Sequence, residues 1–348
     1  MRLTLVPGVG GESQRQLLKR FGLPQAIFAA GHGALSAAIG DQAARALLSH
    51  DAQAGIAAAL AWAAQPGKRI LTLADADYPQ ALLTCADPPV LLYLCGRAEL
   101  LNRRALAIVG SRNPTPQGAA DAGAFGRALG EAGLTVVSGL ALGIDAAAHR
   151  GALDTAGGTV AVIGTGADRI YPEKNRELAL AIARDGAIVS EFALGTPPLA
   201  ANFPRRNRLI AGLASGCLVV EAAARSGSLI TARLAGDCGR EVFAIPGSIH
   251  SPLTKGCHQL IKQGAKLVES AQDILEELRW PAPAVRPEAP ADAAGTALLA
   301  ALGHHPCAID TLVVRSGLTP DALIAMLLQL ELEGRVASLP GGLYQRLH

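Results

Sequence analysis

Short β-branched runs alternate with longer helical segments between about residues 106 and 268. The predicted strands are LAIV, LTVVS, TVAVI, AIVS, CLVVEA, EVFAI and KLV. The helical segments between them tend to end near the glycine expected after a helix C-terminus. Repeated βα units of this length favour a parallel sheet with helices on both faces. The pattern therefore predicts an α/β fold with a doubly wound, mainly parallel sheet.

The rest of the chain divides around this core. Residues 1–65 carry apolar residues at helical spacing and are predicted to form a helical module. The core domain is placed at 66–280, because residues 69–96 read as two added strands joined by a proline-rich connection. Residues 281–293 are rich in proline and alanine and predict a linker. Residues 294–348 read as three helices and a hairpin with a Pro-Gly-Gly turn, the order of a winged helix.

The turn PGVG at residues 7–10 precedes a predicted helix. It fits a helix-hairpin-helix, in which backbone N–H groups at a helix N-terminus meet a phosphate, and it equally fits a plain helix–helix turn. A dinucleotide-binding loop does not fit, because Ser13 stands where the third glycine would fall.

Charge and cysteine content exclude several classes of protein. The formal net charge is only +2, so any anion-binding function must depend on a local patch. Six cysteines are scattered without a CxxC pair, which argues against a zinc site or a redox motif. We find no signal-like segment and no apolar run long enough for a membrane span. We therefore expect a cytoplasmic protein with no cofactor, no metal and no membrane association.

The carboxyl ends of the predicted strands share one chemistry. Ligands of open parallel sheets bind beyond these ends. Six consecutive turns there deliver glycine, serine or both, namely residues 110–112, 138–145, 163–172, 190–198, 221–231 and 246–248. Glycine allows backbone to approach a ligand closely, and hydroxyl and amide groups bind phosphate. The turns predict a phosphate-binding rim.

A cationic cluster, NFPRRNR at residues 202–208, follows one of these turns and contains no carboxylate. Arginine forks bind phosphates bidentately, and Phe203 offers a face on which a base can stack. Asn207 can bond a base edge or hold the loop. We expect at least one arginine to pair internally with Glu191 or Glu221, and the others to await a nucleic acid strand together with Arg112 from the first turn.

Several ordered blocks now resemble one family. The chain contains, in this order, IVGSR, VVSGLALGIDAAAH, YP, SE, FPRRNRLIAGL, VVEAAARSGSLIT, VFAIPGS and LIKQGA. These blocks and their order resemble those of the DNA-processing protein A family, DprA/Smf. The resemblance covers roughly residues 70–270. It implies an extended Rossmann fold, flanked by a helical module similar to a SAM or helix-hairpin-helix domain and by a winged helix. It also implies a non-enzymatic protein that binds single-stranded DNA in natural transformation, forms a homodimer and delivers the strand to the RecA recombinase.

The resemblance also implies a DNA-binding set. The predicted contacts are Arg112, Phe203, Arg205, Asn207 and Arg208, with Arg206 added from the cluster itself and with Ser138, Gly139, Gly227 and Ser228 as the floor.

Two positions depart from the family pattern. His258 stands where many members carry asparagine, and the predicted recognition helix at 319–334 has no lysine or arginine but carries Glu331 and Glu333. Helices that read a DNA groove rarely have this composition. The winged helix is therefore predicted to dock a partner or to be vestigial.

An enzymatic alternative comes from a different class, the lysine-decarboxylase-like nucleotide phosphoribohydrolases. Their glycine-rich loop carries a glutamate for acid–base chemistry. Laying Gly227 and Ser228 on that loop places Thr231 where the glutamate should stand. Asp145 and Glu191 remain as unassigned carboxylates near the rim. A nicotinamide-dependent enzyme does not fit, because no GxGxxG follows LAIV.

Overall fold

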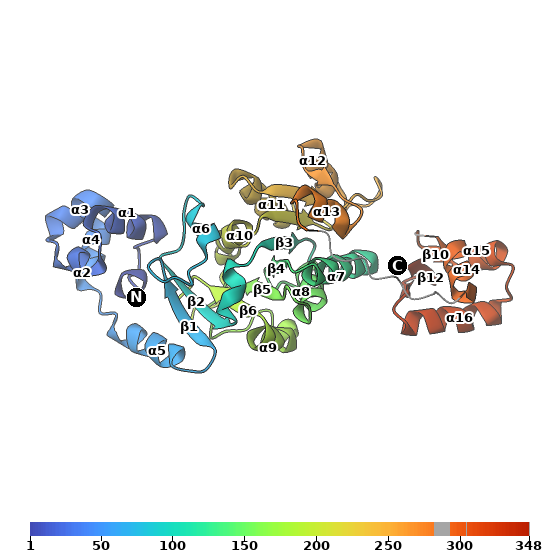
Figure 1. The fold of residues 1–348 in the computed structure, drawn as a ribbon, viewed down its shortest axis with the longest axis horizontal. Helices are drawn as coiled ribbons and strands as arrows, with labels where there is room; N and C mark the ends of the chain where they lie inside the picture. Colours follow the sequence, from blue (N-terminus) through green and yellow to red (C-terminus); the bar gives the residue numbers. More distant parts are fainter. Residues whose placement is uncertain (282–292, 304, 348) are drawn as a thin grey trace.

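The computed structural model describes residues 1–281, 293–303 and 305–347. Figure 1 shows the N-terminal helices, the large sheet with its helices, and the C-terminal module following one another along the long axis. Residues 282–292 of the predicted linker lie outside the described part of the chain.

A nine-stranded mixed sheet forms the centre of the molecule, with the order β1-β2-β6-β5-β4-β3-β7-β8-β9. In this order, the strands from β6 to β9 pair in parallel with one another, whereas β2 is antiparallel to both β1 and β6. The strand bounds are β1 Lys68–Thr72, β2 Leu91–Gly96, β3 Ala105–Val109, β4 Thr135–Ser138, β5 Thr159–Val162, β6 Ala187–Ser190, β7 Gly216–Val219, β8 Glu241–Ala244 and β9 Lys266–Leu267. All seven predicted core strands and both added strands are confirmed.

The order of the strands creates a switch point at β3. This strand pairs with β4 on one side and with β7 on the other. The connection after β3 leads toward β4, whereas the connection after β7 leads toward β8 on the opposite side. The loops after β3 and β7 therefore separate, and a crevice opens at the carboxyl ends of the strands.

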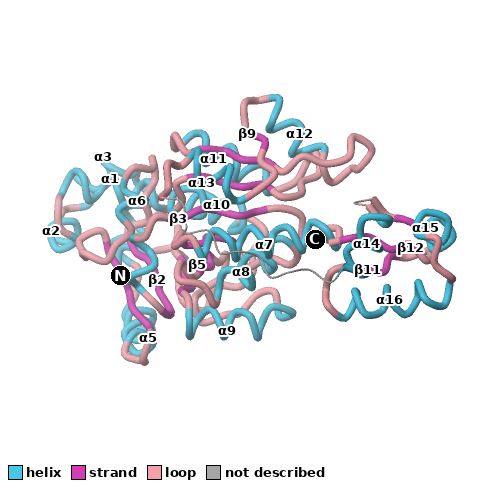
Figure 2. Tube along the Cα trace, turned by 45° about the vertical axis from the view of Figure 1, so that its right-hand side comes forward, coloured by secondary structure: helices cyan, strands magenta, loops and turns pink. Residues whose placement is uncertain are grey.

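Helices cover both faces of the sheet, as Figure 2 shows for the strands drawn between helices. Their bounds are α6 Gln80–Leu83, α7 Pro116–Glu131, α8 Ile144–Leu153, α9 Arg176–Asp185, α10 Asn202–Leu213, α11 Ser228–Asp237, α12 Lys255–Lys262 and α13 Ala271–Glu277, with 3-10 turns η2 Ala98–Asn102 and η3 Glu173–Asn175.

Alternate residues of a strand reach the two opposite cores. Ala107 and Val109 pack with α6, α10, α11 and α12, whereas Leu106 and Ile108 pack with α7, α8 and α13. This period of two is why short, wholly apolar strands suit a sheet buried on both faces. The predicted doubly wound α/β fold is confirmed.

The N-terminal module contains η1 Arg2–Thr4, α1 Gly11–Phe21, α2 Pro24–Ala29, α3 His32–Ile39, α4 Asp41–Ser49 and α5 Gln53–Ala63. Leu17, Leu35 and Leu47 are fully buried in its own small core. A short break at residues 50–52 separates α4 from α5. The Asp51 carboxylate accepts a hydrogen bond from the Gln53 N–H at 2.9 Å, just before α5 begins. The similarity to SAM or helix-hairpin-helix modules stays a prediction.

The C-terminal module is the predicted winged helix. It comprises α14 Ala293–Leu302, β10 Cys307–Ala308, α15 Ile309–Ser316, α16 Pro320–Leu332, β11 Val336–Leu339 and β12 Leu343–Arg346. The three strands pair in the order β10-β12-β11, and the helices bury a separate leucine-rich core.

No single helix among the described residues combines the length and the apolar character of a membrane span. Taken together, α15 and α16 are long enough and apolar enough for such a span, but they are bent by 106° at their junction.

Candidate functional site

A pocket of about 730 Å³ opens at the switch point, beyond the carboxyl ends of β3 and β7. The loop after β3 contributes Arg112, and the segment after β7 contributes residues 225–228. The helix α10 and Tyr171 close the remaining sides. The site therefore lies where the glycine- and serine-rich strand ends predicted it.

Helix geometry divides the cationic cluster into two sets. The cluster is not a loop, because residues 202–213 form α10. Phe203, Arg206 and Asn207 follow a spacing of three and four residues and face the pocket. Arg205 and Arg208 are three residues apart on another side of the helix, and neither lines the pocket.

The second set forms a buried ion-pair network. Glu191, whose side chain is only 3% exposed, accepts hydrogen bonds from Arg205 at 3.1 Å and from Arg208 at 2.5 Å. Arg208 also pairs with Asp87 at 2.8 Å. Burial raises the pKa of Glu191, and the two arginines oppose that shift. The expected internal pairing with Glu191 is confirmed, and Arg208, a predicted DNA contact, is one of the arginines so paired.

Arg206 and the floor residues form a second buried network. Arg206 is 4% exposed, and its Nη1 donates to the carbonyl oxygens of Gly139, at 2.6 Å, and of Val162. Burial lowers the pKa of Arg206 to about 10. Asp145 accepts hydrogen bonds from the N–H groups of Gly139 at 3.0 Å and Ala141 at 3.3 Å, and burial raises its pKa.

These contacts give three of the predicted site residues partners within the protein. A Cβ at Gly139 would overlap both the Arg206 guanidinium and the Asp145 carboxylate, so glycine is needed for their approach rather than for a ligand. Ser138 is fully buried and donates to the Ile108 carbonyl at 2.6 Å. Ser138 and Gly139 thus support the pocket from beneath, whereas Arg206 lines the pocket while its Nη1 is held by backbone carbonyl oxygens.

The pocket mouth carries an aromatic and cationic group of side chains. The guanidinium of Arg112 lies 5.8 Å from the ring centroid of Phe203, a cation–π contact. Tyr171 lies 5.6 Å from the same ring, tilted by 42°. Sequence reasoning missed Tyr171 as a site residue. Its signal was an aromatic residue at a strand end in a chain that is only 3% aromatic.

The opposite wall of the pocket is the N-terminus of α11. Gly227 caps the helix, and the hydroxyls of Ser226 and Ser228 are hydrogen-bonded at 2.7 Å. The predicted pair Gly227 and Ser228 therefore lines the pocket. Arg225 stands beside them, exposed and missed by the sequence reasoning. In the described part of the chain, neither Arg112 nor Arg225 has a hydrogen bond or ion pair.

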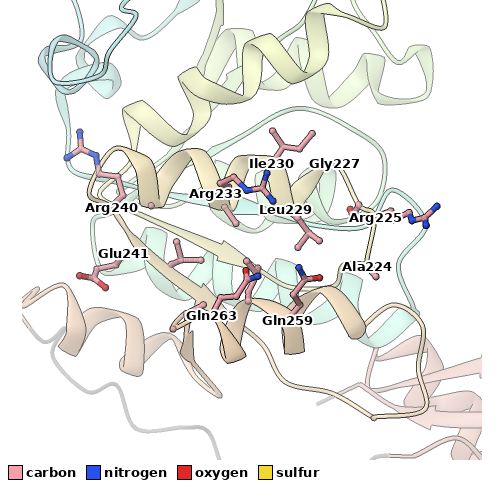
Figure 3. A pocket seen from close by; sticks show the side chains of 17 residues that line it. Ala224, Arg225, Gly227, Leu229, Ile230, Arg233, Arg240, Glu241, Gln259 and Gln263 are labelled. Carbon is pink, nitrogen blue, oxygen red and sulfur yellow. The ribbon is translucent and has the colours of Figure 1, made fainter.

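A second groove of about 580 Å³ continues from this wall between α11 and α12 (Figure 3). It shares Arg225 and Gly227 with the pocket. Arg233, Gln259 and Gln263 also line it. The cationic surface thus extends beyond the pocket across α11.

The carboxylates considered for the enzymatic alternative are already engaged. Glu191 holds two arginines, and Asp145 holds the turn at residues 139–141. Thr231 is buried in the pocket wall where that alternative needs a glutamate. Glu221 accepts hydrogen bonds from the N–H and hydroxyl of Thr115.

His258 lies outside the pocket, where its Nε2 is 3.0 Å from the Gly247 carbonyl oxygen. Within residues 1–281, 293–303 and 305–347, no three His, Cys, Asp or Glu side chains are grouped to hold a metal ion.

Comparison with known proteins gives two family matches. Residues 69–279 match the family model described as DNA recombination-mediator protein A, and residues 281–342 match the DprA winged helix domain. Protein Smf of Escherichia coli (strain K12) is 42% identical over 304 residues, which cover 84% of this chain and 81% of that protein. DNA processing protein DprA of Streptococcus pneumoniae is 49% identical over 209 residues, 60% of this chain and 74% of the relative.

Two solved structures are also similar. The X-ray structure of DprA from Streptococcus pneumoniae has a TM-score of 0.70 and 40% identity, covering 79% of this chain and 95% of that chain. DNA processing protein A from Helicobacter pylori, described for its single-stranded DNA binding mode, has a TM-score of 0.56 and 31% identity. That comparison covers 61% of this chain and 96% of the other.

Proposed function

This chain belongs to the DNA recombination-mediator protein A family, and from that premise we propose that it binds single-stranded DNA in the pocket at the switch point of the sheet. The biological role proposed is DNA processing in natural transformation. The support comes from the names of the relatives, from the single-strand binding described for the Helicobacter pylori protein, and from the chemistry of the pocket.

The observation that carries the proposal is the free Arg112 guanidinium above the Phe203 ring at the mouth of the pocket. A base of a single strand can stack on an exposed aromatic face, and the adjacent guanidinium can hold the phosphate next to it. Tyr171, 45% exposed, widens this stacking surface. A duplex keeps its bases stacked inside, so this arrangement favours an unpaired strand.

The proposed contacts differ in their roles. Arg112 and Arg225 bind phosphates, Phe203 stacks on a base, and Asn207 bonds a base edge. Gly227 and Ser228 add the partial positive charge at the N-terminus of α11. Arg205 is half exposed and sits at the periphery, where it can meet a phosphate only while shared with Glu191.

Binding titrations with single-stranded and duplex DNA of equal length, at several salt concentrations, test the proposal. We expect tighter binding of the single strand, with little sequence preference. With two or three arginine contacts, the log–log salt slope should be roughly −1.4 to −2. Equal or tighter binding of the duplex at the same salt contradicts the proposal.

We extend the proposal to partners. The protein acts as a cytoplasmic, non-enzymatic homodimer that protects the strand and loads RecA onto it, as its family resemblance implies. Sedimentation at micromolar concentration measures the dimer, and the rate of RecA filament formation on strands coated with single-strand-binding protein measures the loading. A monomer that leaves this rate unchanged contradicts the extension, whatever the outcome of the DNA titration.

A further inference from the structure

Two cysteines far apart in the sequence meet on one side of the sheet. Cys85 lies in the segment between α6 and β2, and Cys238 follows the last turn of α11. Their Sγ atoms are 3.6 Å apart, although 153 residues separate them in the chain. Both are half-buried, whereas Cys217, Cys257 and Cys307 are buried. No other cysteine pair in the described part of the chain is hydrogen-bonded.

The surroundings of the pair assign different roles to the two thiols. The Cys238 thiol donates to the sulfur of Cys85, which lies 3.8 Å from the Ala81 carbonyl oxygen. Burial raises the pKa of the Cys85 thiol to about 11, and the nearby Arg240 guanidinium opposes the shift. Arg240 is held there by hydrogen bonds to the Thr84 hydroxyl and the Ala81 carbonyl. Arg240 thus lies beside the thiol pair, where its charge favours the thiolate form of Cys85.

We propose that Cys85 and Cys238 form a reversible intramolecular disulfide when the protein meets a small-molecule disulfide oxidant. Cys238 gives up its S–H proton and attacks one sulfur of the oxidant; the S–S bond of the oxidant breaks, a mixed disulfide forms, and the leaving sulfur takes up a proton as the first released thiol. Cys85 then loses its proton and attacks the Cys238 sulfur, which closes the bridge and releases the second thiol. Two protein thiols are oxidised by two electrons, and the oxidant disulfide is reduced to two thiols.

Closure needs only a small movement. The sulfurs must approach from 3.6 Å to about 2.05 Å, and the loop that carries Cys85 is partly exposed. The same loop is already tied to α10 through the Asp87–Arg208 ion pair. A bridge to Cys238 would fasten it to α11 as well, and these two helices form opposite walls of the pocket.

The disulfide would fix the Cys85 loop to α11 and would not open or close the pocket. Cys238 lies at the C-terminal end of α11, ten residues from the Gly227–Ser228 end, a distance of about 15 Å along the helix. The proposal therefore does not depend on the proposed function.

The test treats the full-length protein with oxidised glutathione, blocks remaining thiols by alkylation, and maps disulfides by peptide mass spectrometry without reduction. We expect a peptide containing Cys85 linked to one containing Cys238. Cys85→Ser and Cys238→Ser should each abolish this link. Cys95→Ser removes another half-buried thiol and should leave the link intact.

A second readout is thermal unfolding. Closing a loop of this length should raise the melting temperature by about 5 °C or more, and a reductant should reverse the change. The Cys95→Ser control should show the same rise, and Cys85→Ser should not. A stable mixed disulfide on Cys238 without the link, or cross-links spread among all the cysteines, overturns the proposal.

Discussion

At the scale of the residue, the arginines near the pocket differ in whether the protein already provides them with polar partners. Arg206 and Arg208 are anchored to carbonyl or carboxylate groups, whereas Arg112 at the pocket mouth has no polar partner among the described residues. A guanidinium that already satisfies buried acceptors cannot leave them for a phosphate without a cost, since the acceptors would then be buried and unpaired. Arginines that are close together in the sequence are therefore not equally available to a phosphate at the pocket.

Arg112→Ala and Phe203→Ala should separate charge from stacking. Loss of Arg112 removes one phosphate contact, so single-strand affinity should fall and the salt slope should become shallower by about 0.7. Loss of Phe203 removes a stacking surface worth about 1–3 kcal/mol per base but no charge, so affinity should fall at an unchanged slope. Titrations at three salt concentrations measure both quantities. Identical slopes for the two variants would show that Arg112 touches no phosphate.

Arg208→Ala should act on stability. It leaves Glu191 buried with only Arg205 as a partner, which should lower the free energy of unfolding by about 2–4 kcal/mol. Urea unfolding followed by the fluorescence of Trp62 and Trp280 measures the change. Arg233→Ala is the matched control, because it removes an exposed arginine that has no ion pair among the described residues. A variant with wild-type stability and a reduced salt slope would return Arg208 to the DNA contacts.

His149 should make the stability depend on pH. Burial lowers its pKa from 6.5 to about 3, with the Arg206 and Arg150 charges as smaller causes. Below pH 6.5 the unfolded chain therefore takes up a proton that the folded chain refuses, so this contribution to stability is present at neutral pH and is lost as the pH falls toward 3. The loss should be about 3 kcal/mol at pH 4.

His149→Asn isolates this effect. Asparagine can keep the hydrogen bond to the Thr159 hydroxyl, which lies 2.7 Å from Nδ1, but it does not titrate. The difference in unfolding free energy between the wild type and the variant should shrink between pH 7 and pH 4. A difference that is constant with pH would contradict a neutral, buried His149.

At the scale of the element, glycines set how closely helices approach their neighbours. Gly118 lies in the first turn of α7, where a Cβ would overlap the carboxylate of Glu221. That carboxylate binds Thr115, whose hydroxyl caps α7 by accepting from the Gly118 N–H. The cap also fixes the end of the loop that carries Arg112. Gly123, in the same helix, has only an ordinary contact at 3.8 Å.

Gly118→Ala and Gly123→Ala should therefore have opposite effects. The first should lower the free energy of unfolding by about 1–3 kcal/mol, because either Glu221 or the helix must move. The second should be neutral or should stabilise by up to about 1 kcal/mol, because alanine is the better helix former. Urea denaturation of both variants makes the comparison, and equal destabilisation would show that helix packing, not the carboxylate, sets the cost.

At the scale of the whole molecule, the winged helix and the first four N-terminal helices bury cores of their own, whereas α5 packs Trp62 against Tyr93 of the central sheet. The cationic pocket is lined only by residues of the central domain. The helix α16 contains no lysine or arginine, and it exposes Ile324, Leu328 and Leu332 on one side. An exposed apolar stripe fits a protein partner better than a groove of DNA.

Truncation after residue 280 should therefore preserve DNA binding. We expect the single-strand affinity of the truncated protein to stay within about threefold of the full-length value, because no pocket residue is removed. Titrations at one salt concentration measure it, with Arg112→Ala in the truncated protein as the control that binding still uses the pocket. A loss of two orders of magnitude would make the winged helix a principal DNA contact.

The local pattern of the sequence determined the elements and their order. Apolar runs of four or five residues suffice to specify strands buried on both faces, and the glycine and serine residues at their ends marked the edge at which the pocket lies. The order of helix and turn patterns after residue 293 predicted the winged helix, and the ordered sequence blocks indicated the family. These features depend on neighbours in the chain, which a sequence displays directly.

Only the tertiary structure decided the role of each side chain at the site. Whether Arg206 or Arg112 is free depends on which carbonyl and carboxylate groups come within 3 Å, and those groups come from strands and loops tens of residues away. The contacts of Tyr171 with Phe203 and of Cys85 with Cys238 also depend on the fold, because the members of each pair lie far apart in the sequence. Hydrogen bonds and ion pairs act over a few ångströms, so their partners are fixed by how the elements pack and not by their distance along the chain.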